Sequence, residues 1–346
     1  MSVTIALAGN PNCGKTTMFN ALTGANQYVG NWPGVTVEKK EGKLKNQKDV
    51  TVTDLPGIYS LSPYTLEEVV SRDYLLKEKP DVIIDLVDAT NIERNLYLAT
   101  QLLEIGIPVV IALNMVDLLK KNNIHINVKG LSSALGCPIV ETSALKGTGL
   151  KEVVDEAIKC ANQHRVPSKQ MEFPKAVEKA VNEIESLVPA NISEENKRWY
   201  AVKLLERDSK VKEGLNLPAS AQSKIEEIAS NLEKAEDDDT ESIVTDGRYQ
   251  YIQKVVSANV KRSGNKMTVS DKIDRIVTNR ILGLPIFILT MFIVYYVSVT
   301  TVGTMVTDWT NDSFVGTIQG VVADGLSGVG VADWLVSLVS DGIIGG

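Results

Sequence analysis

The sequence predicts an α/β domain built on a mostly parallel sheet, then a small all-α domain and one transmembrane helix. Up to about residue 165, short apolar runs alternate with amphipathic stretches, a pattern typical of a parallel sheet with helices on both faces. From residue 166 onward, Glu- and Lys-rich segments carry apolar residues at helical spacing, which predicts helices without strands. Residues 281–302 contain no charged side chain, which indicates a membrane span.

The first 165 residues divide into short apolar runs and longer amphipathic stretches. Strands are predicted at residues 3–8, 50–53, 82–87, 109–113 and 138–140. The more polar run 36–44 suits an added strand at the edge of the sheet. Helices are predicted at residues 15–24, 65–78, 93–105 and 148–163. Further helices at residues 174–187, 194–208, 218–235 and 246–262 are expected to form the all-α domain.

A phosphate-binding loop is predicted near the N-terminus. Residues 9–16 read Gly-Asn-Pro-Asn-Cys-Gly-Lys-Thr and fit the pattern GxxxxGK[ST] between a predicted strand and a predicted helix. In that setting the backbone N–H groups of the loop surround phosphate oxygens at a helix N-terminus. Lys15 is expected to neutralise the β- and γ-phosphates, and the Thr16 hydroxyl to ligate Mg²⁺. The expected phosphate contacts are Asn10, Pro11, Asn12, Cys13, Gly14, Lys15, Thr16 and Thr17.

Two further motifs select the base. Asn114-Met115-Val116-Asp117 follows a predicted strand, and the Asp117 carboxylate can accept two hydrogen bonds, from guanine N1–H and N2–H₂. Adenine has no such donor pair on that edge, so the motif predicts GTP and GDP as ligands. Asn114, followed by Met115, is expected to tie this loop to the phosphate loop. Thr142-Ser143-Ala144 follows the last strand, which places Ser143 at the nucleotide and the Ala144 N–H on guanine O6.

Two other segments are expected to reach the γ-phosphate. Asp54-Leu55-Pro56-Gly57 closes a strand, so Asp54 can hold Mg²⁺ through water and the Gly57 N–H can sense the γ-phosphate. Thr36, preceded by Gly34 and Val35, is the candidate for the mobile threonine that reaches Mg²⁺ when GTP is bound. Five motifs in this order at strand ends predict a Ras-like P-loop GTPase domain.

Charge and cysteine content restrict the partners and the compartment. The formal net charge of −7 offers no basic face, so no nucleic acid is expected as a partner. Cys13, Cys137 and Cys160 are odd in number and lack metal-ligand spacing, so reduced thiols in a cytosolic compartment are expected. Because Cys13 lies at the start of a predicted helix, its thiol pKa is expected to be lowered, and alkylation to block the site.

The uncharged run of 22 residues at 281–302 is long enough to cross a bilayer, since a helix of that length covers roughly 30 Å. Basic side chains crowd its N-terminal side: Lys261, Arg262, Lys266, Lys272, Arg275 and Arg280. The positive-inside rule then places residues 1–280 in the cytoplasm and residues 304–346 outside. We expect residues 266–280 to form a juxtamembrane segment, residues 281–303 to form the span, and the chain to be the front part of a longer polytopic protein.

Several segments together resemble the FeoB family of prokaryotic ferrous iron transporters. They are GNPNCGKTT (9–17), NWPGVTVE (31–38), DLPGIYSLSPY (54–64) and DKIDRIVTNR (271–280). The resemblance implies a GTP-hydrolysing G domain at 1–165, a helical domain at 166–265 like a GDP-dissociation inhibitor, and a multi-pass protein of the inner membrane. It also implies partners: ferrous iron as the transported ion, the remaining polytopic region, a small cytosolic FeoA-like protein and further copies of the chain.

The same resemblance implies a monovalent cation in catalysis. Ile58 stands where Ras-like enzymes carry the glutamine that orients the attacking water, and similar GTPases compensate with K⁺ beside the β- and γ-phosphates. Asn12 matches the K⁺ ligand of such proteins, and backbone carbonyls of the 28–34 loop would complete the shell. The expected catalytic residues are Asn12, Lys15, Thr36 and Gly57. Cys13 departs from the family, whose members often carry serine there.

Other functions remain open at this point. The same motif set occurs in soluble GTPases that act on ribosomes or tRNA, although the 281–302 run and the absence of a basic appended domain count against that function. A long uncharged helix can also be buried inside a soluble protein, but such helices seldom reach this length without a polar side facing water. A transporter of another divalent metal, such as Mn(II), fits these residues equally well.

Overall fold

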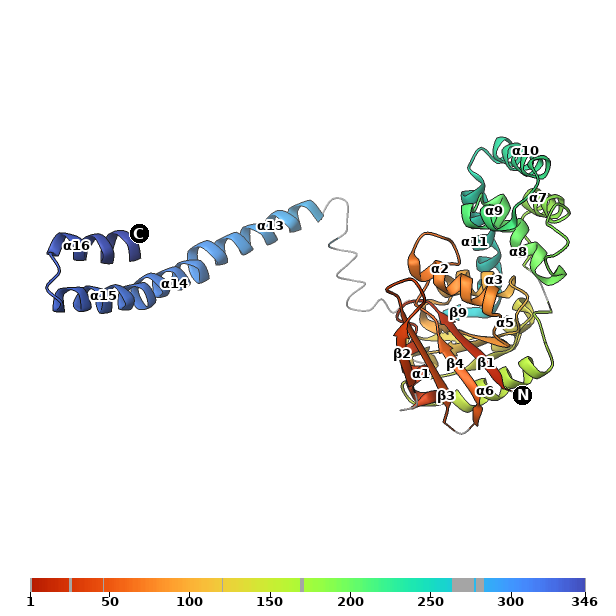
Figure 1. The fold of residues 1–346 in the computed structure, drawn as a ribbon, viewed down its shortest axis with the longest axis horizontal. Helices are drawn as coiled ribbons and strands as arrows, with labels where there is room; N and C mark the ends of the chain where they lie inside the picture. The colour runs from red at the N-terminus through yellow and green to blue at the C-terminus, as the bar shows by residue number, and fades with distance from the viewer. Residues whose placement is uncertain are drawn as a thin grey trace. The chain divides into compact units, whose positions relative to one another are not determined.

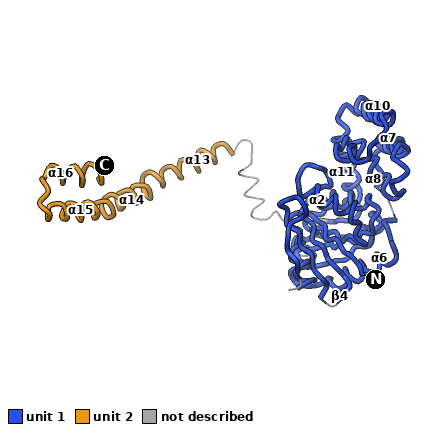
Figure 2. Tube along the Cα trace, viewed as in Figure 1, with its two compact units in different colours: residues 1–264 blue, residues 265–346 orange. Residues whose placement is uncertain are grey.

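The structure, a computed structural model, describes residues 2–24, 27–45, 47–119, 121–168, 171–262, 277 and 283–345. Figure 1 shows a sheet with helices around it and, further along the chain, a separate run of helices. The chain divides into two compact units, Met1–Gly264 and Asn265–Gly346 (Figure 2). The first unit contains the sheet and every motif for nucleotide binding, and the second contains the apolar run.

A seven-stranded sheet with the order β2-β3-β4-β1-β5-β6-β8 forms the centre of the first unit. Its strands are β1 (Val3–Gly9), β2 (Gln27–Asn31), β3 (Glu38–Leu44), β4 (Gln47–Asp54), β5 (Val82–Asp88), β6 (Val109–Asn114) and β8 (Ile139–Glu141). Neighbours from β4 to β8 pair in parallel, whereas β2, β3 and β4 pair antiparallel. The predicted mostly parallel sheet is confirmed.

The predicted edge strand is wrong in position. Residues 36–44 were expected at the edge, but β3 lies one place inside it and β2 forms the edge. The five residues of β2, Gln-Tyr-Val-Gly-Asn, contain no apolar run and stay partly or fully exposed. Their extended conformation comes from pairing with β3, from Gln27 opposite Gly42 to Asn31 opposite Glu38. A strand that depends on a partner rather than on burial leaves little periodicity in the sequence.

Helices cover both faces of the sheet, as predicted. They are α1 (Lys15–Thr23), α2 (Leu66–Asp73) with a π-helical turn at Tyr74–Glu78, α3 (Ile92–Leu103), α4 (Val116–Leu119), α5 (Val128–Leu135) and α6 (Leu150–Asn162). Alternate residues of β1 point to opposite faces, as strand geometry requires. Ile5 and Leu7 pack in one core with side chains of α1 and α6, whereas Ala6 and Ala8 belong to a second core with side chains of α3 and α5.

The second core continues into the group of helices that follows the sheet domain in the sequence. Figure 1 shows these helices beside α2 and α3. These are α7 (Lys175–Glu185), α8 (Glu194–Leu205), α9 (Ser209–Leu215), α10 (Ala219–Glu236) and α11 (Thr240–Asn259). Helix α11 begins six residues before the predicted start at 246, because the Asp239 side chain caps it by accepting the Ser242 N–H. The predicted helical end at 260–262 is wrong: β9 (Val260–Arg262) pairs with β7 (Ile124–Ile126).

Two buried ion pairs join the helical group to the helices on the sheet. Arg72 of α2 contacts Asp208 at 2.9 Å, and Arg248 of α11 contacts Glu104, just after α3, at 2.7 Å. All four side chains are almost fully buried. Removing one member of such a pair leaves an uncompensated charge in the core, which costs about 3–5 kcal/mol. The two predicted domains therefore share one core and its internal charges.

In the second unit, the apolar helix is longer than the predicted span. Of the residues that the structure describes, those from Gly283 to Gly328 form one helix of 46 residues that is long and apolar enough to cross a membrane. It comprises α13 (Gly283–Tyr296), α14 (Gly303–Asp308) and α15 (Gly316–Gly328), joined by π-helical turns at Val297–Val302 and Trp309–Val315; α16 (Asp333–Ser337) and a further π-helical segment at Leu338–Ile344 follow. The helix continues through residue 303, because neither a proline nor a charged residue interrupts the sequence at that point. The predicted juxtamembrane segment 266–280 lies outside the described residues, apart from Val277.

An unusual carboxyl group lies in the middle of the sheet. Asp85, on the interior strand β5, is 1 % exposed, and its Oδ2 has no hydrogen-bond partner among the described residues. Burial alone raises the pKa of this carboxyl to about 7, because the charged form loses its hydration. The group is therefore mainly neutral in the folded protein below about pH 7.

The variant Asp85→Asn is expected to remove part of the pH dependence of stability. The folded pKa of about 7 exceeds the ordinary value of 3.8, so the folded state binds more protons between these values. The free energy of unfolding therefore falls as pH rises from about 4 to about 7, by up to about 1.4 kcal/mol per pH unit, and levels off above. Asparagine stays neutral, so the variant should exceed the wild type in stability above pH 7.

Urea unfolding of residues 1–264 at a series of pH values measures this effect through tryptophan fluorescence, to which the buried Trp32 and Trp199 contribute. Asp49→Asn, at an exposed carboxylate of β4, is the matched control and should follow the wild-type profile. An Asp85→Asn profile parallel to that of the wild type would contradict the assignment.

Candidate functional site

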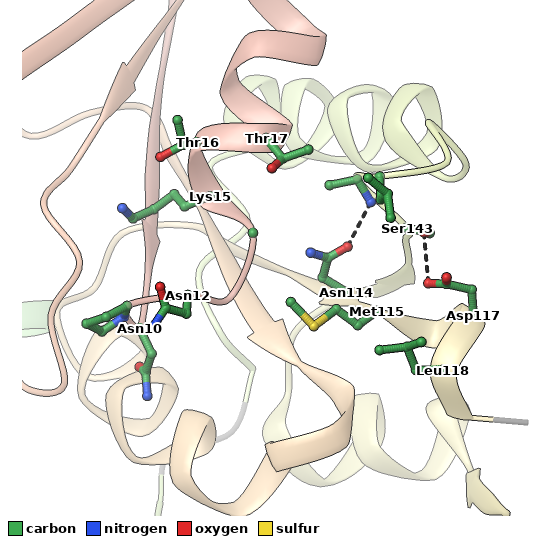
Figure 3. A pocket seen from close by; sticks show the side chains of 14 residues that line it. Asn10, Asn12, Lys15, Thr16, Thr17, Asn114, Met115, Asp117, Leu118 and Ser143 are labelled. Atoms are coloured by element: carbon green, nitrogen blue, oxygen red, sulfur yellow. Dashed lines mark hydrogen bonds between the residues drawn. The ribbon is translucent and has the colours of Figure 1, made fainter. Parts of the chain in front are cut away.

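A pocket of about 480 Å³ opens at the carboxyl ends of β1 and β6, beside the N-terminus of α1 (Figure 3). It is lined by Asn10, Pro11, Asn12, Gly14, Lys15, Thr16, Thr17, Asn114, Met115, Asp117, Leu118, Ser143, Ala144 and Leu145. Crevices at the carboxyl ends of parallel strands are the usual ligand sites of such sheets. Three of the five predicted motifs meet there, although the first and the last of them lie more than 120 residues apart in the sequence.

The phosphate loop depends on two glycines. Gly14 caps α1 with φ at 98°, and a Cβ there would lie 2.4 Å from Asn114 Nδ2. Gly9 has φ at 148°, and a Cβ there would lie 2.7 Å from the carbonyl oxygen of Leu86. Asn12 also adopts a positive φ, 65°, which asparagine tolerates better than most residues. The loop can therefore turn tightly and present its N–H groups at the start of the helix.

Lys15 and Asp54 form the charged end of the site. Lys15 Nζ lies 3.5 Å from Asp54 Oδ1, and both side chains are largely buried. Burial raises the pKa of Asp54, and the neighbouring Lys15 counteracts part of that shift. Oδ1 accepts no hydrogen bond from the described residues, so it retains an acceptor position for a cation or its water. Together with the hydroxyl of Thr16 in the pocket, these oxygens suit Mg²⁺.

Asn114 connects the two ends of the pocket. Its Nδ2 donates to the Cys13 carbonyl at 2.8 Å. Its Oδ1 accepts from the Ala144 N–H at 2.9 Å, the bond drawn from Asn114 in Figure 3. The predicted tie between the base loop and the phosphate loop is confirmed by the first bond. The second bond gives the Ala144 N–H a partner inside the protein, whereas the sequence analysis assigned this N–H to guanine O6. Met115 follows with φ at 62° and turns the chain toward Asp117.

Asp117 lies at the other end of the pocket with both oxygens in contact with one loop. Ser143 Oγ donates to Oδ1 at 2.9 Å, and Lys146 Nζ lies 3.2 Å from Oδ2 (Figure 3 shows the Ser143 bond). The hydrogen bond from Ser143, followed by the contact with Lys146, lowers the pKa of Asp117. The carboxylate is therefore ionised at neutral pH, as an acceptor of two N–H donors must be.

The segment around Thr36 is outside the pocket. The Trp32 N–H donates to the Val37 carbonyl at 2.9 Å, and the Val35 N–H to the Trp32 carbonyl at 3.2 Å, which closes a turn between β2 and β3. Gly34, Val35 and Thr36 belong to this turn, and Thr36 is exposed. The expected loop at 28–34 is also wrong for residues 28–31, because they are paired in β2. In this conformation the segment supplies no ligand to the pocket.

The segment after β4 lies behind the phosphate loop. A Cβ on Gly57 would lie 3.2 Å from Pro11 Cα, so this glycine permits close backbone contact. The Ile58 N–H donates to the Gly9 carbonyl at 3.3 Å, and its side chain is buried. Ile58 therefore points into the core and cannot orient a water, in agreement with its side-chain chemistry. Asp54 and Gly57 are adjacent to the pocket without lining it.

Two leucines that the sequence analysis did not predict line the pocket. Leu118 follows Asp117 directly, and Leu145, which is 86 % exposed, follows Ala144. Their positions directly after the two base motifs could have indicated in the sequence that they face the nucleotide. An exposed leucine that faces a pocket is suited to contact the flat apolar face of a base.

The expectation for Cys13 is wrong. Its side chain is 1 % exposed, and its Sγ packs beside Gly9 and next to Leu86 rather than in front of the helix. Burial raises the pKa of this thiol to about 12, although Lys15 opposes the shift. Cys137 and Cys160 are free and buried as well. Cys13 therefore packs as a small apolar residue and is not a reactive thiol.

The comparisons with known proteins agree with this geometry. The family model "Ferrous iron transport protein B" matches residues 3–157, and the model "FeoB cytosolic helical domain" matches residues 173–261. The Fe(2+) transporter FeoB of Shigella flexneri is 38% identical over 99% of this chain, which corresponds to 44% of that protein. A fusion of Fe(2+) transport protein A with FeoB from Porphyromonas gingivalis is 38% identical over 99% of this chain and 42% of its own length.

A solved structure extends the comparison to three dimensions. The crystal structure of NFeoB from S. thermophilus bound to GDP.AlF4- and K+ is 48% identical, with a TM-score of 0.68. The match covers 74% of this chain and 99% of that one. Sheet order, phosphate loop and base motifs are those of a Ras-like P-loop GTPase domain. Within that class, the chain belongs to the FeoB family, and it spans less than half the length of its curated relatives.

Native Cys13 is expected to resist alkylation. With the pKa raised to about 12, roughly one thiol in ten thousand is ionised at pH 8, against about one in four for a free cysteine. Iodoacetamide treatment followed by mass spectrometry of the Cys13 peptide measures the rate. Modification should be at least about 100-fold slower than in the urea-unfolded chain. Rapid labelling of the folded protein would show that the thiol is reactive after all.

Proposed function

We propose that residues 1–165 bind and hydrolyse GTP, and that this activity serves a transporter of ferrous iron in the inner membrane. The observation that carries the proposal is the pocket in which a phosphate loop and an ionised Asp117 face the same space. The transport activity rests on family membership, because the chain spans 44% of its Shigella flexneri relative. Residues 166–265 are then the helical domain, and residues 281–303 the first crossing of the membrane.

The nucleotide contacts follow from the pocket. Asp117 accepts guanine N1–H and N2–H₂, while Ser143 orients its carboxylate. The N–H groups of residues 10–17 and the ammonium of Lys15 hold the phosphates. Lys15 now faces Asp54, and the phosphates of the nucleotide give it a stronger partner inside the pocket. Asp54 is then released for a cation, which supports its proposed role on Mg²⁺ together with Thr16.

Hydrolysis requires the residues that are outside the pocket to approach it. Thr36 and Gly57 are the proposed contacts of the Mg²⁺ and the γ-phosphate, and Thr36 lies in the exposed turn after β2. Binding of GTP would draw this turn toward the pocket, as switch loops do in related GTPases. The segment 54–66 would move with it, because Gly57 packs on Pro11 of the phosphate loop.

K⁺ is the proposed second cation. The Asn12 side chain faces the pocket and forms no hydrogen bond with other described residues, so its carbonyl oxygen is available (Figure 3). The other proposed ligands, carbonyls of residues 28–34, do not fit in this conformation, because none of these residues lines the pocket. When bound, K⁺ supplies positive charge beside the phosphates. This chain's own contribution is the oxygen of Asn12, and the relative from S. thermophilus was solved with K+.

The helical group is suited to receive a signal from the segment 54–66. Lys203, which is almost fully buried, lies 3.5 Å from Ser62 Oγ and 2.6 Å from Glu206. The Tyr64 hydroxyl donates to Glu241 of α11. A change in this segment would therefore alter contacts on α8 and α11. This supports the proposal that the helical domain biases the G domain toward GDP and passes its state to the membrane part.

Further partners follow from the family. The fusion protein of Porphyromonas gingivalis supports a FeoA-like protein as a partner of this chain. The apolar helix supports attachment to the membrane, with the remaining polytopic region carrying the iron. Assembly of several copies is proposed from the resemblance alone. Iron remains preferred over Mn(II) because the family is named for ferrous iron.

The variant Asp117→Asn is expected to lose guanine nucleotides and gain xanthine nucleotides. Asparagine cannot accept both guanine donors, but its amide can donate to the C2 carbonyl of xanthine and accept its N1–H. GDP affinity should fall at least about 100-fold, because guanine donors are left unpaired. Displacement of a fluorescent GDP analogue measures this, with Asp155→Asn on the exposed face of α6 as control. In the full-length protein, Fe²⁺ uptake that survives this variant would refute the link between GTP and transport.

The variant Asn12→Ala is expected to abolish stimulation by K⁺. The wild type should hydrolyse GTP at least about tenfold faster in K⁺ than in Na⁺, because a well-placed positive charge stabilises the transition state. Without the Asn12 oxygen, the two rates should become equal. Phosphate release in the two salts at equal ionic strength measures the ratio. Equal rates in the wild type would exclude the K⁺ role and leave the GTPase proposal intact.

A further inference from the structure

The loop from Ser143 to Thr148 is a closed structure rather than a free connection. The Ser143 N–H donates to the Thr148 carbonyl at 3.0 Å, and the Thr148 N–H donates back to Ser143 at 3.2 Å. Inside this ring, the Lys146 N–H donates to the Ser143 carbonyl at 3.1 Å. Gly147 allows the turn, with φ at 69°. The backbone of Lys146 is therefore fixed relative to the end of β8.

From this fixed position, Lys146 reaches Asp117 on α4. Its Nζ lies 3.2 Å from Oδ2, while Ser143 holds Oδ1 at 2.9 Å. The side chain of Asp117 is 18 % exposed and that of Lys146 is 59 % exposed, so the pair lies at the rim of the pocket. Both oxygens of the carboxylate are thus held by the same loop, one by a hydroxyl and one by an ammonium.

We propose that Lys146 is a positioning residue for guanine recognition, which holds Asp117 Oδ2 so that this oxygen receives the 2-amino group. The inference rests on the proposed binding of guanine nucleotides. Each carboxylate oxygen has two acceptor positions, so the ammonium and the base can bind Oδ2 together. The terminal torsion of an aspartate is soft, and without Lys146 only Oδ1 would be held.

A second effect acts in the same direction. A base placed on Asp117 removes water from the carboxylate, and an unpaired carboxylate in such a place loses part of its hydration. The ammonium of Lys146 offsets that loss from the solvent side. Neutral residues at position 146 would leave the loop closed, because its ring of backbone hydrogen bonds does not use the Lys146 side chain. The contribution of the side chain can therefore be separated from the loop itself.

The test compares GDP with IDP, whose hypoxanthine base lacks the 2-amino group. Affinities are measured for the full chain in detergent micelles, by displacement of a fluorescent GDP analogue. Lys146→Ala should weaken GDP about tenfold and IDP less than about threefold, because only GDP uses Oδ2 as an acceptor. Lys146→Arg keeps a cation at Oδ2 and should stay within about threefold of the wild type for both. The GDP effect should shrink at 1 M salt, since the pair is partly exposed.

Lys151→Ala is the matched control, because this lysine is exposed on α6 beyond the loop. Equal losses of GDP and IDP would reduce Lys146 to a structural support and overturn the proposal. Tighter GDP binding by Lys146→Ala would also overturn it, since the ammonium would then compete with the base. A wild type that binds neither GDP nor GTP would instead refute the proposed function.

Discussion

The site depends on the side chain of Asn114, which is buried between the two halves of the pocket and bonds to both. One amide group holds the Cys13 carbonyl in the phosphate loop and the Ala144 N–H in the base loop. Asn114 Nδ2 lies so close to position 14 that a Cβ there would collide with it, which explains why position 14 carries glycine. The distance between Asp117 and Lys15 is thereby set by hydrogen bonds in the core rather than by flexible loops. A nucleotide with the right length between base and phosphate meets a site that is already formed.

A second constraint comes from the charges buried beneath the helical group. Arg72 with Asp208 and Arg248 with Glu104 each join an element beside the sheet to the helices that follow. Charges in a core are costly to separate, so such pairs resist sliding of the helices past the sheet. Ser62 and Tyr64, which contact Lys203 and Glu241, are less buried than these four side chains, which suits a segment that has to move. Rigid and mobile contacts are thus divided between different parts of one interface.

The sequence predicted the features that short-range spacing controls. Gly9, Gly14 and Lys15 have fixed places in one loop between a strand and a helix, and Asp117 follows Asn114 by three residues. The parallel sheet followed from apolar strands alternating with helices. The errors concern residues whose state depends on distant neighbours. Cys13 is buried by Leu86, β2 is extended only because β3 pairs with it, and the start of α11 depends on the cap at Asp239. No motif includes Lys146, because its partner Asp117 is 29 residues away in the sequence.

The pairing of β2 with β3 has a consequence for how the protein would tell two nucleotides apart. Thr36 is held away from the pocket by a hairpin that is already folded, so the resting state is an ordered one with its own hydrogen bonds. Under the proposed function, delivery of Thr36 to the pocket would disturb this pairing at the edge of the sheet, and contacts with a third phosphate would offset the lost hydrogen bonds. A diphosphate would offer no such contacts and would leave the edge closed. The five residue pairs between β2 and β3 would then set a free-energy cost that the triphosphate can offset and the shorter diphosphate cannot.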